Sequence, residues 1–174
     1  MKKNGGFTVI ELMIVLAMLV VLSALAIPSI RGLSTSTGRS RAASEIISDM
    51  ALARMTAIRS GRSVAITVIP PTQYTMTYVD DGSNVEGHTT VDISDFRGGV
   101  QFTLLPPGGA TPPPVATITF TPRGFAQAVP QGWGDFYLTD QANNPNEVIR
   151  LETTFAGVTN MMRYAPANDA WVYF

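Results

Sequence analysis

The sequence predicts an α+β fold in which one long N-terminal α-helix packs on a C-terminal, mostly antiparallel β-sheet domain. Three observations support this prediction. An apolar run extends from Phe7 to Ile30, and beyond it apolar residues recur at spacings of three and four as far as Ile58. After Gly61 the apolar period changes to two, which is typical of strands. The 174 residues suffice for one domain of ordinary size and an additional segment.

The apolar run, residues 7–30, is long enough for a transmembrane helix. A helix of this length measures about 36 Å, whereas the hydrocarbon core of a bilayer is about 30 Å thick. Lys2 and Lys3 precede the run, so the positive-inside rule places the N-terminus in the cytoplasm and the rest of the chain outside. A secretory signal peptide has a shorter apolar region that ends in a small-residue cleavage site, and the length of this run disfavours one.

Glu11 is the only ionisable residue of that run. A lone carboxylate at bilayer depth costs several kcal/mol unless it is neutral or paired. Two interpretations are open. Glu11 lies near the cytoplasmic interface and stays hydrated, or it pairs with an amine that cleavage between Gly6 and Phe7 would create, in its own chain or in a neighbour. Such a pair would fix the register between helices whose apolar surfaces otherwise slide freely.

Residues 6–12 read GFTVIEL and follow a short basic leader. This stretch resembles the type III signal of type IV pilins and type II secretion pseudopilins. The resemblance implies that prepilin peptidase removes residues 1–6 by cutting between Gly6 and Phe7, that Phe7 is then N-methylated, and that the chain enters the inner membrane before assembly. It also implies that Glu11 is an assembly group.

One helix is expected from about Phe7 to Ser60. Pro28 removes a backbone donor and clashes with the preceding turn, so we expect a bend there. In the family that the chain resembles, this region bends or loosens on assembly, which makes Pro28 a second assembly residue. Residues 32–38 have weak helix propensity, and Gly61 is the expected C-cap.

The neck and the second half of the helix, residues 31–61, are predicted to carry an apolar stripe. The stripe comprises Ala43, Ile46, Ile47, Met50, Ala53, Ala57 and Ile58. The charged residues expected mostly off the stripe are Arg39, Arg41, Glu45, Asp49, Arg54 and Arg59, and the arginines among them are expected on solvated faces or in subunit contacts. We interpret Met50 and Met55 as core residues rather than as ligands or as a partner-binding surface.

Residues 62–174 are predicted to form the β domain, because short alternating segments are separated by Pro, Gly and Asn turns. The expected strands are Val64–Ile69, Tyr74–Tyr78, Val100–Leu105, Ala116–Thr121, Phe136–Thr139, Val148–Glu152, Val158–Tyr164 and Ala170–Tyr173.

Two stretches narrow the resemblance to the GspH/FimT group of minor pseudopilins and minor pilins. Residues 50–61, followed by the strand at 64–68, resemble the group's helix and first strand, and residues 118–124 (ITFTPRG) resemble a later strand and turn. The resemblance implies a pilin-like fold and a minor pseudopilin of a type II secretion system, which helps to export folded proteins. The alternative is a minor type IV pilin that primes pilus assembly. A major pilin is disfavoured, since those commonly carry a C-terminal cysteine pair and this chain has no cysteine.

The same resemblance implies where the chain acts and with what. The expected partners are other pseudopilins or pilins, prepilin peptidase, an inner-membrane assembly platform and the lipid bilayer. The expected topology is a single pass through the bacterial inner membrane with the β domain in the periplasm, from where it enters a pseudopilus or pilus.

Other candidate sites have simpler explanations. Asp80–Glu86 gathers oxygen ligands for Ca²⁺, but it lacks the alternating spacing of a dedicated loop, so a solvated turn is favoured. His88 is the only histidine and has no partner for a triad or a zinc site. Pro106–Pro114 is expected to be an exposed hairpin connection, and Trp133 either anchors a partner or covers the core. We therefore expect no enzyme activity, metal or cofactor.

Nucleic acid is also a disfavoured partner. The formal net charge is −1, so no global basic field exists to attract a polyanion. Some FimT-like minor pilins bind DNA through basic residues near the C-terminus. Here Arg150 and Arg163 stand among three carboxylates, Glu147, Glu152 and Asp169, which departs from that pattern.

Overall fold

The structure is a computed structural model that describes residues 8–79, 85–96, 98–103, 116–129, 134–140 and 147–173. The chain divides into two compact units, residues 1–34 and residues 35–174. The first unit contains the beginning of the helix, and the second contains its remainder together with all the strands.

A single helix, α1, extends from Val9 to Ser60 over 52 residues, which confirms the predicted helix. It continues without interruption through Pro28 and through residues 32–38, so the weak propensity of that stretch does not break it. The bend expected at Pro28 stays a prediction. The helix ends where expected, because Gly61 adopts a φ of 67° and donates its N–H to the carbonyl of Ala57 at 3.1 Å.

The first unit presents an apolar helix surface. Every large apolar side chain from Val9 to Leu22 is exposed, and the least exposed is still 48% exposed. We expected residues 7–30 to span a membrane, but no helix in the described part of the chain is long and apolar enough to cross one.

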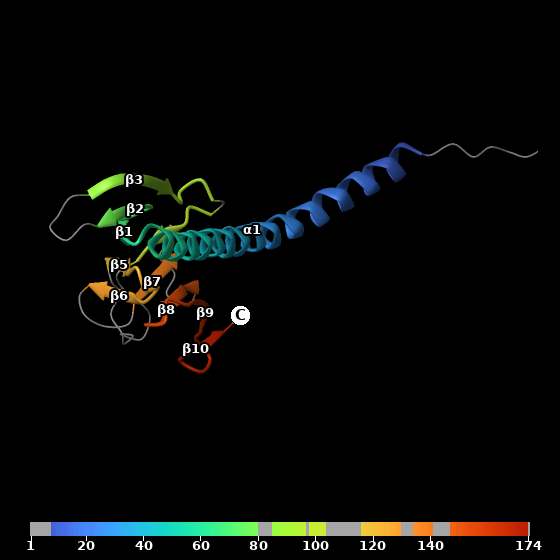
Figure 1. Cartoon of the computed structure of the whole chain (residues 1–174). Helices are drawn as coiled ribbons and strands as arrows, with labels where there is room; N and C mark the ends of the chain where they lie inside the picture. Colours follow the sequence, from blue (N-terminus) through green and yellow to red (C-terminus); the bar gives the residue numbers. More distant parts are fainter. Residues whose placement is uncertain are drawn as a thin grey trace, which may run out of the picture. The chain divides into compact units, whose positions relative to one another are not determined.

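The second unit contains two five-stranded antiparallel sheets, and α1 packs on both of them (Figure 1). The first sheet has the order β3-β2-β1-β5-β6. Its strands are β1 (Ser63–Ile69), β2 (Gln73–Val79), β3 (Val85–Asp92), β5 (Thr117–Phe120) and β6 (Ala126–Val129). The second sheet has the order β10-β9-β8-β7-β4. Its strands are β4 (Gln101–Phe102), β7 (Gly134–Thr139), β8 (Ile149–Thr153), β9 (Thr159–Ala165) and β10 (Ala170–Tyr173).

All eight expected strands are present, although β4 keeps only two residues of the segment expected at 100–105. Two strands were missed, β3 and β6, and they form the two edges of the first sheet. β3 reads VEGHTTVD and β6 reads AQAV. Neither has the strong apolar alternation on which a strand prediction depends, since an edge strand is paired on one side only.

The core lies between the helix and the two sheets. The helix contributes Ala42, Ala43, Ile46, Met50, Ala53 and Ala57, all at most 1% exposed. Met55 was expected in this core, but its side chain is 57% exposed. Met55 follows Met50 by five positions, which turns its side chain about 140° around the helix and away from the stripe. Ile58 is exposed as well, so the buried stripe ends at Ala57.

Substitutions at two turn glycines should separate backbone strain from crowding. At Gly61 an added Cβ meets nothing within 4 Å, so Gly61→Ala should lower the free energy of unfolding by about 1 kcal/mol through its left-handed backbone alone. At Gly157, with a φ of 76°, an added Cβ lies 2.5 Å from the carbonyl oxygen of Gly124. Gly157→Ala should therefore cost about 2–4 kcal/mol. Urea unfolding measures both variants, and equal losses would contradict the prediction.

Candidate functional site

The start of the helix is closed by a capping box formed by Thr8 and Glu11. The Glu11 backbone N–H donates to Thr8 Oγ1 at 3.3 Å, and the Thr8 backbone N–H donates to Glu11 Oε2 at 3.5 Å. The carboxylate therefore faces the N–H groups of the first turn, where the helix dipole favours a negative charge. The spacing T-x-x-E in the sequence indicates this cap, although we did not predict the cap from it. Gly6 and Phe7 lie outside the described residues.

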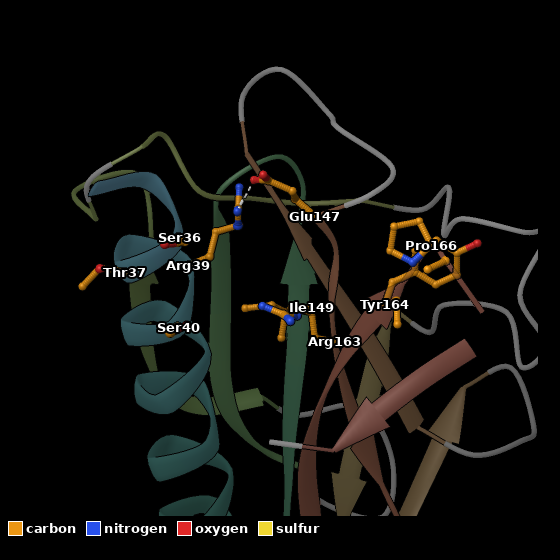
Figure 2. A pocket seen from close by; sticks show the side chains of 11 residues that line it. Ser36, Thr37, Arg39, Ser40, Glu147, Ile149, Arg163, Tyr164 and Pro166 are labelled. Atoms are coloured by element: carbon orange, nitrogen blue, oxygen red, sulfur yellow. Dashed lines mark hydrogen bonds and ion pairs between the residues drawn. The ribbon is translucent and has the colours of Figure 1, made fainter. Parts of the chain in front are cut away.

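A pocket of about 690 Å³ lies between α1 and the second sheet in the unit 35–174 (Figure 2). The helix contributes Arg39 to it, and the strands contribute Ile149, Arg163 and Tyr164. Arg39 is 4% exposed. Its guanidinium forms an ion pair with Asp140 at 3.1 Å and a second one with Glu147, toward which it points in Figure 2.

The expectation that Arg39 lies on a solvated face or in a subunit contact is therefore wrong. Arg39 precedes the buried Ala43 by four residues, which places it on the apolar stripe. Its charge suggested an exposed position, whereas its spacing indicated a buried one. The two carboxylates supply the paired, hydrogen-bonded surroundings that a buried charge needs.

A second buried charge cluster lies on strands β7 and β8. Arg150 Nε donates to Asp135 Oδ2 at 3.1 Å, and its NH2 group lies 3.1 Å from Glu152 Oε1. The guanidinium also lies 5.8 Å from the ring centroid of Trp171 on β10. Arg150, a residue considered for DNA, is thus buried and already engaged, while Arg163 is exposed on β9.

Asp135 is fully buried, and its Oδ1 has no hydrogen-bond partner among the described residues. Burial raises the pKa of this carboxyl to about 6, against the opposing charge of Arg150. The cluster therefore joins β7 and β8 through charges that pair with one another.

The end of the helix is fastened to both sheets through two glycine turns. Arg54 Nε donates to the carbonyl of Gly124 at 3.0 Å, and Gly157 lies against the same two residues. Next to these turns, the rings of Phe125 and Phe155 stack with centroids 4.9 Å apart. The expected turn at Gly124 is confirmed, with a φ of 81°.

The remaining candidates give no site in the described part of the chain. The segments 80–84 and 106–114 lie outside the described residues, as do Trp133 and the side chains of Glu86 and His88. Among the residues that the structure describes, no three acidic or histidine side chains group together as metal ligands would.

Comparison with known proteins identifies the family. The family model described as type II transport protein GspH matches residues 42–157, and a model of the prokaryotic N-terminal methylation motif matches residues 1–27. The chain belongs to the GspH family. The match begins at the first fully buried alanine of α1 and ends at the turn glycine Gly157, so it covers the helix stripe, the first sheet and both glycine turns.

Relatives of this GspH-family chain include pilins and pseudopilins. A fimbrial protein of Pseudomonas aeruginosa is 36% identical over 104 residues, which cover 57% of this chain and 65% of that protein. The chain thus matches less than two thirds of the length of its curated relatives. The type IV minor pilin FimU of P. aeruginosa has a TM-score of 0.53 at 17% identity, covering 77% of this chain and 92% of FimU. The minor pseudopilin EpsH of Vibrio cholerae has a TM-score of 0.50 at 12% identity, covering 72% of this chain and 96% of EpsH.

These findings confirm the pilin-like α+β fold and the pilin and pseudopilin superfamily. The chain therefore belongs to the superfamily of type IV pilins and pseudopilins, and its first 27 residues carry the N-terminal methylation motif.

Removing the buried charge of Arg39 should destabilise the unit 35–174. Arg39→Ala removes a buried guanidinium that forms ion pairs with Asp140 and Glu147, so the free energy of unfolding should fall by about 3 kcal/mol. The exposed Arg41 is the matched control, and Arg41→Ala should change stability by less than about 0.5 kcal/mol. Urea unfolding gives the free energy of unfolding of both variants. A loss for Arg39→Ala as small as the one for Arg41→Ala would contradict a stabilising role of the ion pairs.

Asp135 should make stability fall as the pH rises. A carboxyl with a raised pKa holds its proton more tightly in the folded chain than in the unfolded chain, so its contribution is complete below about pH 4 and is lost by about pH 6. The loss should be at most about 3 kcal/mol. Asp135→Asn carries no titrating group and should lack this component. Urea unfolding of both proteins from pH 4 to 7 measures the difference, and parallel pH profiles would refute it.

Proposed function

We propose that this chain is a non-enzymatic minor subunit of a type IV pilus, where it takes part in starting pilus assembly. The observation that carries the proposal is its 36% identity to a fimbrial protein. The fold it shares with the minor pilin FimU supports the same reading. From the sequence we expect a secretion pseudopilin, with the minor pilin as the alternative, whereas these relatives favour the pilus.

The described residues supply the parts that such a subunit needs. The exposed apolar side chains of residues 9–22 form a surface for packing among the helices of neighbouring subunits and among lipid tails. The carboxylate of Glu11 already faces the first turn of the helix, where its Oε2 accepts from the backbone N–H of Thr8 at 3.5 Å. After cleavage, the new amine of Phe7, in this chain or in a neighbour, would be a cation with which the Glu11 carboxylate can pair.

The remaining steps follow from this function. Prepilin peptidase cuts between Gly6 and Phe7, Phe7 is N-methylated, and residues 7–30 anchor the chain in the inner membrane with its N-terminus in the cytoplasm. The β domain then faces the periplasm, and the inner-membrane assembly platform inserts the subunit among other pilins.

The second candidate is a minor pseudopilin of a type II secretion system. It is favoured by the GspH family model over residues 42–157 and by the fold shared with EpsH. Both candidates use the same helix, the same processing and the same kind of neighbour, and they differ in the filament that incorporates the chain.

Substitution of Glu11 separates its two roles. Glu11→Gln keeps the capping box, since Gln also serves at this position, but removes the charge. If the charge sets the register between helices, the variant should be processed and inserted normally, yet filament incorporation should fall about tenfold or more, as for Glu11→Ala. Immunoblots of membranes and of sheared filaments measure the two steps.

Gly6→Ala is the control for processing in the same experiment, and it should leave uncut precursor in the membrane. Normal filament incorporation of Glu11→Gln would reduce the role of Glu11 to the helix cap. Normal cleavage of Gly6→Ala would remove the basis for the processing site itself.

An in-frame deletion, compared with the complemented strain, tests the function. Loss of surface filaments with unchanged export of folded proteins is the outcome we expect. Folded exoproteins that vanish from the medium and collect in the periplasm would instead assign the chain to secretion. Unchanged filaments together with unchanged export would contradict both candidates.

A further inference from the structure

An apolar groove lies along the end of α1, on the side of the β8–β9 turn. It has a volume of about 580 Å³ and lies wholly within the unit 35–174. Its lining residues are Ile47, Ala51, Arg54, Met55, Ile58, Arg59, Gly157, Val158 and Thr159. This groove is distinct from the Arg39 pocket at the opposite end of the same helix segment.

The groove keeps large apolar side chains at the surface. Met55, Ile58 and Val158 are each about half exposed, although the opposite face of the helix is fully buried. The rings of Phe125 and Phe155, which stack next to the two glycine turns, are exposed as well. Exposed apolar side chains gathered in this way are typical of an interaction site.

The turns that border the groove are held in place. The Gly124 carbonyl accepts from Arg54, and the Ala126 N–H donates to the Phe155 carbonyl at 3.0 Å, which joins the two turns. Their glycines approach so closely that a Cβ on Gly157 would overlap Gly124. The groove is therefore formed before any partner binds, which lowers the entropic cost of binding.

The charges around the groove have one sign. Arg54 and Arg59 line it, and no carboxylate does. Among the described residues neither arginine has an ion pair with an acidic side chain, and Arg54 uses only its Nε in the bond to Gly124. An apolar floor with two arginines at its border complements a segment that carries apolar side chains and a carboxylate.

We propose that this groove receives an amphipathic, carboxylate-bearing segment of a neighbouring filament subunit. This inference rests on the proposed function, because it needs a filament in which this chain has neighbours. The apolar side chains of the segment cover Met55, Ile58 and Val158, and its carboxylate pairs with Arg54 or Arg59. The groove thus gives the β domain a specific contact, in addition to the less specific packing of the apolar helix.

A lipid surface is the alternative occupant, and it is one of the outcomes of the crosslinking experiment that follows.

Site-specific photocrosslinking on the full-length chain in its own bacterium identifies the occupant. Benzoylphenylalanine replaces Val158 in the groove, and it replaces Leu52 as the control. Leu52 is equally exposed on the same helix but does not line the groove. We expect crosslinks from position 158 to a peptide that contains Asp or Glu and belongs to another subunit with the methylation motif. Crosslinks to lipid, to a peptide without a carboxylate, or equally from both positions would overturn the proposal, as would none.

Charge substitution tests the electrostatic part. Met55 lines the groove and is exposed, so Met55→Glu should not disturb the core but should repel the carboxylate of the partner. Filament incorporation of Met55→Glu should fall about tenfold. Incorporation of Met55→Lys should fall less, and incorporation of the control Leu52→Glu should not change. Equal losses for Met55→Glu and Met55→Lys, or for Leu52→Glu, would overturn the role of charge.

The deletion strain distinguishes failure of this inference from failure of the proposed function. If the deletion abolishes filaments while Met55→Glu supports them fully, the function stands and the groove inference fails. If the deletion changes neither filaments nor export, the proposed function fails and the groove inference fails with it.

Discussion

The structure depends on a helix face made largely of alanine. Ala43, Ala53 and Ala57 are fully buried, and their small side chains let the backbone of α1 approach both sheets. The sheets fill the remaining space with large residues such as Phe120 and Phe136. Because one helix face closes the core of both sheets, the sheets cannot separate from the helix without exposing that core. A force or rotation applied to this part of the helix is therefore transmitted to the whole β domain.

Polar contacts fix the position of the helix on this smooth face. Asp49 accepts a hydrogen bond of 2.5 Å from the hydroxyl of Tyr74 on β2, which ties the helix to the first sheet. Burial, followed by the bond to Asp49, raises the pKa of Tyr74, so its hydroxyl remains a donor. Arg39 makes the corresponding tie to the second sheet, and Arg54 joins the helix end to the glycine turns. Such directional contacts specify one register, which alanine packing alone does not.

The sequence predicted features that depend on local periodicity and failed on those that depend on distant neighbours. The stripe from Ala43 to Ala57 was predictable because a helix places such residues on one face. The strands β3 and β6 were not predicted because edge strands need less apolar alternation. The burial of Arg39 was not predicted because its charge suggested an exposed position, although its spacing placed it on the stripe. The hydrogen bond from Arg54 to Gly124 joins residues 70 positions apart in the sequence, so no pattern of neighbouring residues predicts it. The capping box of Thr8 and Glu11 was local and readable, but the carboxylate was interpreted only as a membrane charge.

The exposed surfaces of this chain explain why it needs two kinds of contact. Residues 9–22 present apolar side chains all around the helix, and such a surface packs equally well at many rotations and offsets. In lipid the hydrophobic effect gives no preference for one neighbour over another, so packing there holds subunits together without choosing among them. Choice requires directional groups, and the described chain provides them at both ends of α1: the carboxylate of Glu11 at the start, and the arginines beside the apolar groove at the end. In the proposed filament the chain has to be distinguished from other subunits with similar apolar helices. The selective contact therefore belongs in the β domain, where the rigid groove offers a surface that one kind of neighbour can fit.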